Sequence, residues 1–262
     1  MKEIYPYVGI TGFMHQAEVG AVLEVFPDSA KTGRKLMVGV LVSGKTLEGL
    51  PNRWQNRYPA IDKVRDIFLD HPDVLNLVHF NTKEKESEKI LQQMLEIAHR
   101  AGENCHGFQL NLKWPNPAMI KAYKERYPDH AIVLQCGSAA LEAVGEEDRE
   151  ERVALNLRNY REVCDYVLLD PSGGEGVQMD PQALLKYLDI FDSMPSLRGM
   201  FFGVAGGLES ANLPILEPIM RKRPSTSINT ERRQRDANDN LDVFKSCMFV
   251  EDIFRMYHSW GV

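Results

Sequence analysis

Two glycine-rich turns, 172–176 and 203–207, are the segments of this sequence best suited to hold an anion. Each turn follows an apolar run and precedes a pattern of helical period. Glycine lets backbone N–H groups approach an anion closely, and a helix that follows adds the positive end of its dipole. The two turns are therefore typical of an α/β protein that handles phosphate.

Polar residues that close apolar runs are the second group of candidates. Gln109 and Asn111 stand two residues apart, so on a strand they share one face, while Leu110 takes the other. If the runs form a closed parallel barrel, the carboxyl ends of the strands meet at one rim, where that architecture carries its active site. The candidates at this rim are Thr11, His15, Ser43, His79, Asn81, Gln109, Asn111, Lys113, Gln135, Asp170, Asn229, Thr230, Glu231 and Arg232.

The elements that must position these side chains alternate along the whole chain. The predicted strands are 7–12, 35–43, 74–81, 107–112, 131–137, 166–170, 199–204 and 226–230. The predicted helices are 16–26, 60–69, 87–100, 118–125, 148–164, 181–191, 213–221 and 240–257. This alternation predicts an α/β fold, a (β/α)8 TIM barrel in a single domain over residues 1–262. A doubly wound open sheet is the alternative, because one miscounted strand would favour it.

Charge and cysteine content argue against several classes of protein. The net charge of −6 argues against general nucleic-acid binding, which needs an excess of Lys and Arg. No apolar run reaches about 18 residues, so we expect no membrane span. Reduced thiols and a cytoplasmic location are expected, because no C-x-x-C spacing indicates a disulfide set or zinc site. The cysteines are Cys105, Cys136, Cys164 and Cys247.

The order of segments and several motifs resemble phosphoribosylanthranilate isomerase, a TIM barrel of tryptophan biosynthesis. Gly-Ile-Thr at 9–11 looks like the family's opening K-I-C-G-I-T. Residues 165–170, followed by Gly-Gly-Glu-Gly, resemble D-x-x-L-L-D … G-G-T-G-K. Ala-Gly-Gly-Leu at 205–208 with Asn212 resembles A-G-G-L-x-x-x-N-V. The resemblance implies a phosphorylated sugar as substrate and an Amadori rearrangement of an aldose to a ketose.

The same resemblance implies a role for each candidate. Asp170 occupies the position of the general acid that opens the furanose ring, although an Asp before Pro171 is also a common turn cap. Gly206 and Gly207 would cradle the phosphate together with the backbone at Asn229 and Thr230. The remaining substrate contacts are predicted at Gln109, Asn111, Gln135, Gly173 and Gly174, and Arg232 and Arg233 are candidates for further phosphate contacts.

The departures from the family concern the base and the substrate loops. Val8 stands where the family has the cysteine that acts as general base. A replacement base must come from another strand end, and the candidates are His15, His79 and Glu231. The family's arginine for the anthranilate carboxylate, in a loop after the second strand, has no secure counterpart. Lys31 and Arg34 are the basic residues near that point of the sequence.

Two classes of function stay open on these grounds. The first is an isomerase of this type, acting on a phosphorylated sugar or amino-sugar, and a related isomerase or lyase on another sugar phosphate belongs with it. The second is a catalytically silent barrel that binds a phospho-ligand. No cofactor is expected, and a metal centre is disfavoured because His15, His79 and His106 show no ligand spacing. The oligomeric state, monomer or homodimer, is open.

Overall fold

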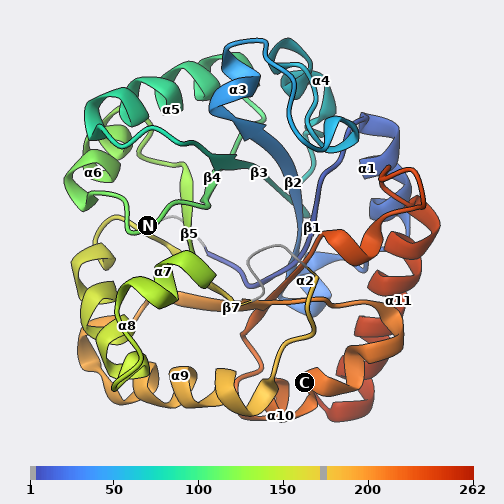
Figure 1. Cartoon of the computed structure of the whole chain (residues 1–262). Coiled ribbons are helices and arrows are strands. Elements are labelled where there is room, and N and C mark those ends of the chain that lie inside the picture. Colours follow the sequence, from blue (N-terminus) through green and yellow to red (C-terminus); the bar gives the residue numbers. More distant parts are fainter. Residues whose placement is uncertain (1–3, 172–175) are drawn as a thin grey trace.

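The computed structural model describes residues 4–171 and 176–262, and its strands form a ring around the centre of the molecule (Figure 1). Over the described residues eight parallel strands pair in chain order, and the last pairs with the first to close a barrel. This confirms the predicted (β/α)8 barrel and excludes the open sheet. The strands are β1 (Tyr7–Thr11), β2 (Lys35–Ser43), β3 (Val74–Asn81), β4 (Gly107–Leu110), β5 (Ala131–Gly137), β6 (Tyr166–Asp170), β7 (Phe201–Ala205) and β8 (Ser227–Thr230).

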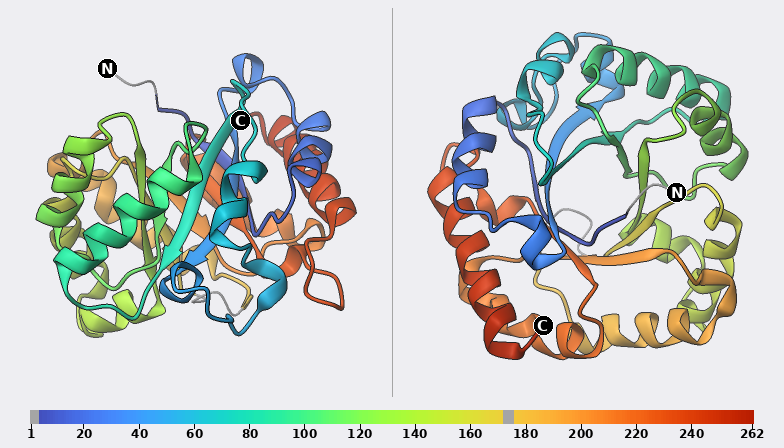
Figure 2. Two further views of the ribbon diagram at one scale, coloured as in Figure 1. Left: turned by 90° about the horizontal axis from the view of Figure 1, so that it is seen from above. Right: turned by 180° about the vertical axis from the view of Figure 1, so that it is seen from behind.

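Helices surround the barrel on all sides (Figure 2). The first helix, α1, lies beside the last, α11, which closes the outer ring (Figures 1 and 2). The helices are α1 (Gln16–Glu24), α2 (Ser29–Thr32), α3 (Gly44–Leu47), α4 (Val64–Ile67), α5 (Ser87–Ala101), α6 (Pro117–Arg126), α7 (Ser138–Ala143), α8 (Arg149–Leu157), α9 (Pro181–Ser193), α10 (Glu217–Lys222) and α11 (Val243–Trp260). Short 3-10 turns complete them: η1 (Gln55–Arg57), η2 (Ile61–Lys63), η3 (Arg158–Tyr160), η4 (Pro195–Leu197), η5 (Ser210–Leu216) and η6 (Arg232–Gln234).

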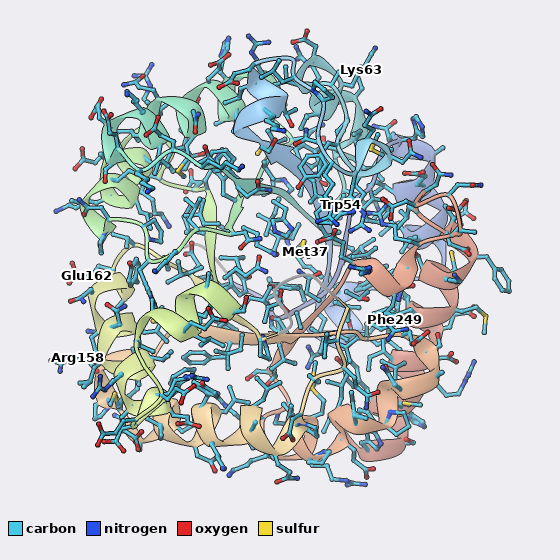
Figure 3. The ribbon with its side chains drawn as sticks, in the orientation of Figure 1. Met37, Trp54, Lys63, Arg158, Glu162 and Phe249 are labelled. Atoms are coloured by element: carbon cyan, nitrogen blue, oxygen red, sulfur yellow. The ribbon has the colours of Figure 1, made fainter. Side chains whose placement is uncertain are left out.

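Strand alternation divides the core into two layers. Side chains that point outward, such as Val8, Phe108 and Leu110, are fully buried between the barrel and the helices. Side chains that point inward, such as Tyr7 and Met37, form a separate cluster inside the ring of strands, where Figure 3 shows Met37. Because neighbouring side chains of a strand take opposite faces, the polar residues that follow this inner cluster along each strand also point into the barrel.

Several predicted elements differ from the observed ones at their ends. The segment predicted as a helix at 60–69 is a 3-10 turn followed by the short α4. The segment predicted at 213–221 begins as a 3-10 turn, because Pro214 removes a backbone donor and α10 starts only at Glu217. The fourth strand ends at Leu110, two residues before its predicted end. None of these shifts moves a candidate residue to the other rim of the barrel.

The composition led us to expect reduced cysteines and no membrane-spanning helix. All four cysteines are free thiols; Cys105, Cys136 and Cys164 are buried, and Cys247 is partly exposed. Burial raises the pKa of the Cys105 and Cys136 thiols to about 12. Within the described ranges, none of the helices combines the length and the apolar character needed to cross a bilayer.

Candidate functional site

A cavity of about 310 Å³ opens at the carboxyl ends of the strands. In this architecture the loops that follow the strands build the active site at that rim. The cavity contains carboxylates, carboxamides, an imidazole and guanidinium groups from all around the barrel. Its lining residues are Leu41, Trp54, Arg57, Tyr58, His79, Asn81, Gln109, Asn111, Gln135, Leu168, Asp170, Gly176, Ala205, Gly206, Gly207, Asn229, Glu231 and Arg232.

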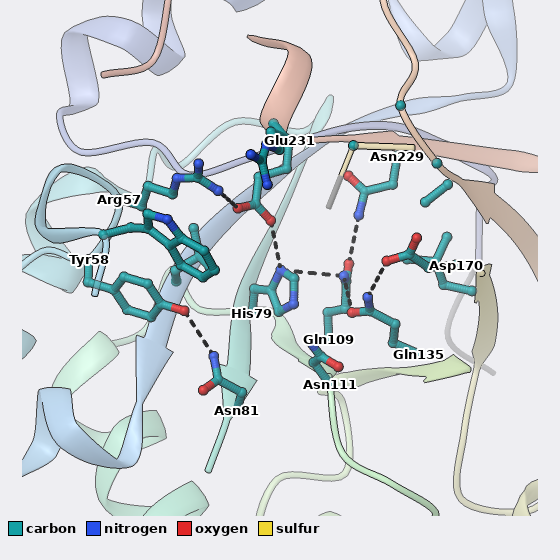
Figure 4. A pocket seen from close by; sticks show the side chains of 18 residues that line it. Arg57, Tyr58, His79, Asn81, Gln109, Asn111, Gln135, Asp170, Asn229 and Glu231 are labelled. Carbon is teal, nitrogen blue, oxygen red and sulfur yellow. Dashed lines mark hydrogen bonds and ion pairs between the residues drawn. The ribbon is translucent and has the colours of Figure 1, made fainter. Parts of the chain in front are cut away.

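A chain of hydrogen bonds crosses the floor of the cavity and ends on Asp170 (Figure 4). Thr11 Oγ1 donates to Asn229 Oδ1 over 3.3 Å, and Asn229 Nδ2 donates to Gln109 Oε1 over 3.0 Å. Gln109 Nε2 donates to Gln135 Oε1 over 2.9 Å, and Gln135 Nε2 donates to Asp170 Oδ2 over 2.8 Å. The chain runs in one direction and joins β1, β8, β4, β5 and β6. It fixes the amide orientations and holds Oδ2 of Asp170 in place.

His79 lies beside this chain, and its Nδ1 is near both Gln109 of the chain and Glu231. Its Nδ1 is 3.5 Å from Gln109 Nε2, beyond ordinary hydrogen-bond length, and 4.0 Å from Glu231 Oε2. Its Nε2 is buried and has no hydrogen-bond partner among the described residues. Burial lowers the pKa of His79, although the charges of Glu231 and Asp170 act in the opposite direction. The ring is therefore neutral near pH 7.

Arg57 holds Glu231 and Asp239 together at one side of the cavity. Arg57 Nη1 is 3.0 Å from Glu231 Oε1, and Arg57 Nη2 is 2.6 Å from Asp239 Oδ1. Arg57 Nε donates to Asp239 Oδ2 over 2.9 Å, so the contact with Asp239 is bidentate. Arg57 as a whole is 4% exposed. This cluster ties the loop between β2 and β3 to the loop that follows β8.

Aromatic side chains from the same β2–β3 loop form a wall of the cavity (Figure 4). Trp54 lies under the Arg57 guanidinium, whose Cζ is 4.9 Å from the ring centroid. The hydroxyl of Tyr58 accepts a hydrogen bond from Asn81 Nδ2 over 3.0 Å. The wall therefore combines apolar ring surface with a fixed hydroxyl.

Glycines of two loops pack against each other at the opposite side. Gly207 has a φ of +57°, and a Cβ there would lie 2.6 Å from the carbonyl oxygen of Gly176 and 2.9 Å from the nitrogen of Gln178. Gly206 has a φ of +135°. Arg232 packs against Gly176, and Arg233 Nε donates to the Gly176 carbonyl over 3.3 Å. Glycine is required at 207 for both its backbone angle and this close approach.

None of the described residues that line the cavity comes from the first strand. Val8 points outward into the layer under the helices and is fully buried there. The neighbouring inward position is Gly9, where a Cβ would lie 2.6 Å from Met37 Cε and 3.0 Å from Asn229 Oδ1. Met37 therefore fills the space that a side chain from this part of β1 would occupy.

The structure brings most of the predicted residues together and leaves several apart. Asp170, Gln109, Asn111, Gln135, Gly206, Gly207, Asn229, His79, Glu231 and Arg232 all line the cavity. Thr230 does not line it, because its hydroxyl donates to the Leu208 carbonyl behind the strand. His15 is exposed at the start of α1 and does not line the cavity. Gly173 and Gly174 lie outside the described residues.

Two other candidates, Ser43 and Arg34, do not line the cavity. Ser43 Oγ donates to Asn52 Oδ1 over 2.7 Å in the turn after β2. Arg34 precedes β2, at the opposite rim, and donates to the Thr226 carbonyl over 2.9 Å. Within the described ranges no group of three or more His, Cys, Asp or Glu side chains is placed to hold a metal ion.

The sequence interpretation missed the contribution of the β2–β3 loop. Trp54, Arg57 and Tyr58 line the cavity, yet they lie 11 to 15 residues beyond the end of β2 at Ser43. A usable signal was present, because two aromatic residues and an arginine fall within five positions of a loop. Such a cluster in a long βα loop is typical of a binding wall.

No protein-family model matches the sequence, and no curated protein matches it significantly. Solved structures do match the barrel. Phosphoribosylanthranilate isomerase from Thermus thermophilus is 16% identical with a TM-score of 0.63, covering 95% of this chain and 99% of its own. The enzyme from Thermotoga maritima is 19% identical with a TM-score of 0.63, covering 96% and 100%.

A third structure shows such an isomerase with a bound ligand. It is a phosphoribosylanthranilate isomerase in complex with reduced 1-(o-carboxyphenylamino)-1-deoxyribulose 5-phosphate, 18% identical with a TM-score of 0.62, covering 96% of this chain and 100% of its own. Identities this low establish a shared fold and leave chemistry to the site itself. The chain has the barrel fold of the phosphoribosylanthranilate isomerases, which agrees with the resemblance seen in its sequence.

Proposed function

We propose that this protein is a phosphosugar isomerase that converts an N-substituted aldosylamine phosphate to the corresponding ketose by an Amadori rearrangement. The observation that carries the proposal is the pairing of two different ionisable groups on one cavity floor. Asp170 and His79 both line the cavity, and a carboxamide chain fixes the space between them. An Amadori rearrangement needs an acid and a base on separate groups.

Asp170 is the general acid in this proposal. Its Oδ2 accepts from Gln135 Nε2, so the proton available for transfer resides on Oδ1. Donation of that proton to the furanose ring oxygen breaks the bond between this oxygen and C1, and the substituent nitrogen forms an iminium with C1. The carboxylate that remains faces the iminium and stabilises its positive charge.

His79 is the general base. Because the ring is neutral, Nε2 carries a lone pair in the tautomer whose Nδ1 proton faces Glu231. Once the ring turns so that Nε2, buried in this structure, faces the sugar, Nε2 takes the proton from C2 of the iminium and the enolamine forms. The imidazolium then returns this proton to C1, while the C2 hydroxyl gives its proton to the Asp170 carboxylate and the C2 carbonyl of the ketose forms. Glu231 stabilises the imidazolium while it exists, and Arg57 holds Glu231 in position. His79 thus supplies the base that β1 lacks.

The phosphate is proposed to lie at the glycine side of the cavity. Gly206 and Gly207 follow β7, the region where barrels of this class commonly hold phosphate by backbone N–H groups. Arg232 lines the same side and adds positive charge. This placement leaves the sugar over the carboxamide floor, with C1 and C2 between Asp170 and His79.

An NMR assay with synthetic substrates tests the proposal. The protein is incubated with N-aryl-5-phosphoribosylamines, and 1H spectra are followed for the 1-arylamino-1-deoxyribulose 5-phosphate product. We expect product from at least one arylamine with the wild type and its loss with His79→Gln and Asp170→Asn. His71→Gln is the matched control, because His71 lies in the loop before β3, far from the cavity rim. Product formation that is equal in all four proteins would exclude the assigned roles.

A second candidate is a barrel that binds a phospho-ligand without turnover. The specific observation in its favour is the Gly9 position, where Met37 fills the space for an ionisable side chain on β1. This candidate predicts phosphate-dependent binding of the ketose analogue and no product in the NMR assay. The two candidates are therefore separated by one experiment.

A further inference from the structure

The charged groups of the cavity are divided between its two sides. Arg57 and Glu231 lie with His79 at the aromatic side, and Asp170 lies across the carboxamide floor from them (Figure 4). The phosphate of the proposed substrate is assigned to the glycine side. The aromatic side therefore faces the substituent on the sugar nitrogen, and its chemistry decides which substituent fits.

The guanidinium at the aromatic side is already neutralised. Arg57 contacts the carboxylates of Glu231 and Asp239 through Nη1, Nη2 and Nε, at distances between 2.6 and 3.0 Å. One positive charge on Arg57 therefore faces two negative charges, and the Arg235 guanidinium also interacts with both carboxylates. The two carboxylates come from the same chain segment after β8, so the arrangement is built into the loop.

A carboxylate on the ligand would be unfavourable at this position. It would have to displace Glu231 from Arg57, and Glu231 would then face the neutral, buried ring of His79. Two carboxylates close together in a partly desolvated pocket repel each other, and an uncompensated buried charge is costly. An uncharged group that donates hydrogen bonds meets no such penalty.

The hydrogen-bond acceptors of this side match such a donor. Glu231 lines the cavity, and its Oε2 can accept a hydrogen bond from a ligand N–H. The Tyr58 hydroxyl and the Asn81 carboxamide add a donor and acceptors. The Trp54 ring, which also contacts the guanidinium groups of Arg53 and Arg57 at 4.8 and 4.9 Å from its centroid, adds apolar surface to the lining.

We infer that this isomerase takes a phosphosugar whose nitrogen substituent is a planar, uncharged group bearing N–H donors, such as an aryl carboxamide or a nitrogen heterocycle, and that it disfavours a carboxyaryl substituent. The inference rests on the proposed function, because it assumes that the sugar phosphate occupies the rest of the cavity. It concerns substrate specificity. The residue that discriminates between a carboxyaryl and an uncharged substituent is Glu231, because it occupies Arg57 and so prevents Arg57 from binding a ligand carboxylate.

Calorimetry with a matched pair of ligands tests this inference. The pair is reduced 1-(2-carboxyphenylamino)-1-deoxyribulose 5-phosphate and its 2-carbamoylphenyl counterpart, which differ only in carboxylate against carboxamide. At pH 7.5 we expect the carbamoyl ligand to bind at least about tenfold more tightly to the wild type, a difference of 1.4 kcal/mol. We expect Glu231→Gln to remove most of this difference, because the variant should bind the carboxy ligand more tightly than the wild type does. Glu217→Gln is the control, since Glu217 pairs with Arg221 on the outer helix α10.

Each outcome has a distinct meaning. Tighter binding of the carboxy ligand, or equal binding of both, overturns the inference and leaves the proposed function standing. A preference for the carbamoyl ligand that Glu231→Gln does not change overturns the role of Glu231. Failure of both ligands to bind overturns the proposed function and the inference with it.

Discussion

Gln135 donates a hydrogen bond of 2.8 Å from Nε2 to Oδ2 of Asp170, at the end of a chain in which every donor points toward that carboxyl group. The chain begins at Thr11 on β1 and reaches β6 through β8, β4 and β5. The Asp170 carboxylate is the final acceptor, and it sets the direction in which the hydrogen bonds of the chain point. The chain in turn holds the Asp170 side chain in the cavity. His79 lies beside the chain, on the same cavity floor as Asp170.

Asp170→Asn is expected to abolish catalysis and to spare binding. The introduced carboxamide can still accept from Gln135 through its oxygen, so the floor keeps its geometry, but it has no acidic proton to give. We expect kcat to fall by roughly 10²–10⁴-fold, the contribution of a general acid, with Kd for the ketose analogue nearly unchanged. Calorimetry and the NMR assay measure the two quantities.

Asp165→Asn is the matched control for this substitution. Asp165 precedes the same strand at the opposite rim, where Oδ2 accepts from the Ile132 backbone and pairs with Lys124 at 3.1 Å. It should lower stability without lowering kcat. If the Asp165 and Asp170 variants lose turnover equally, the loss is structural and Asp170 is not the acid.

The pH dependence of turnover should report His79. Burial lowers its pKa, so the neutral base persists below pH 6.5, the ordinary value for histidine, and the acid limb of kcat should lie below that pH. Glu231 opposes the shift, so Glu231→Gln should move the limb further toward low pH. An acid limb above pH 6.5, or a shift of the variant toward high pH, contradicts the assignment.

The same histidine should affect stability. Its pKa is lower in the folded state than in the unfolded chain, so its favourable contribution is complete above about pH 6.5 and is lost as pH falls toward the folded value. Urea denaturation of His79→Gln should show a shallower loss of unfolding free energy across this range than the wild type. Identical pH slopes in the two proteins would mean that His79 is not held neutral by burial.

Val8→Cys tests whether the sequence motif alone identifies the base. Position 8 lies in the layer between β1 and the helices, so a thiol there cannot reach the cavity. We expect no gain in turnover and a change in unfolding free energy below about 1.5 kcal/mol, since the side chains have similar volume. A marked increase in kcat in the NMR assay would show that β1 presents position 8 to the substrate.

Gly207→Ala should disrupt the proposed phosphate site. Its φ is +57°, and the added Cβ would meet the backbone of Gly176 and Gln178 at 2.6 and 2.9 Å, so one loop must move. We expect the Kd for inorganic phosphate to rise by about tenfold, equal to 1.4 kcal/mol. Gly33→Ala is the matched control, because Gly33 has a φ of +65° with nothing within 4 Å of its added Cβ. Equal phosphate affinity in both variants would place the phosphate elsewhere.

The sequence predicted the barrel and the polar floor because both depend on local periodicity. Gln109 and Asn111 share a face through simple strand alternation, and both line the cavity. Thr230 differs from these two residues. Because Asn229 points into the barrel, alternation sends Thr230 to the outer face of β8, where its hydroxyl donates to the Leu208 carbonyl. The family motif placed both residues at the phosphate and so overrode what alternation predicts.

The aromatic side of the cavity could not be predicted in the same way. Arg57 ends the short turn η1 in the β2–β3 loop, and its partners Glu231 and Asp239 are 174 and 182 residues away. Only the closed barrel brings these loops together. Val8 illustrates an effect of strand register. Aligning the Gly-Ile-Thr letters with the family motif puts Val8 at the position of the catalytic cysteine, but in the structure Gly9 points inward and Val8 points outward.

The most direct test of the central claim is calorimetry of the wild type with reduced 1-(2-carbamoylphenylamino)-1-deoxyribulose 5-phosphate, alone and in excess inorganic phosphate. The account predicts binding at a single site, weakened by phosphate and retained in Asp170→Asn. Absence of binding by both this ligand and its 2-carboxyphenyl counterpart in a protein that is folded by circular dichroism, or binding that phosphate leaves unchanged, would contradict the account of a phosphosugar site at the carboxyl end of the barrel.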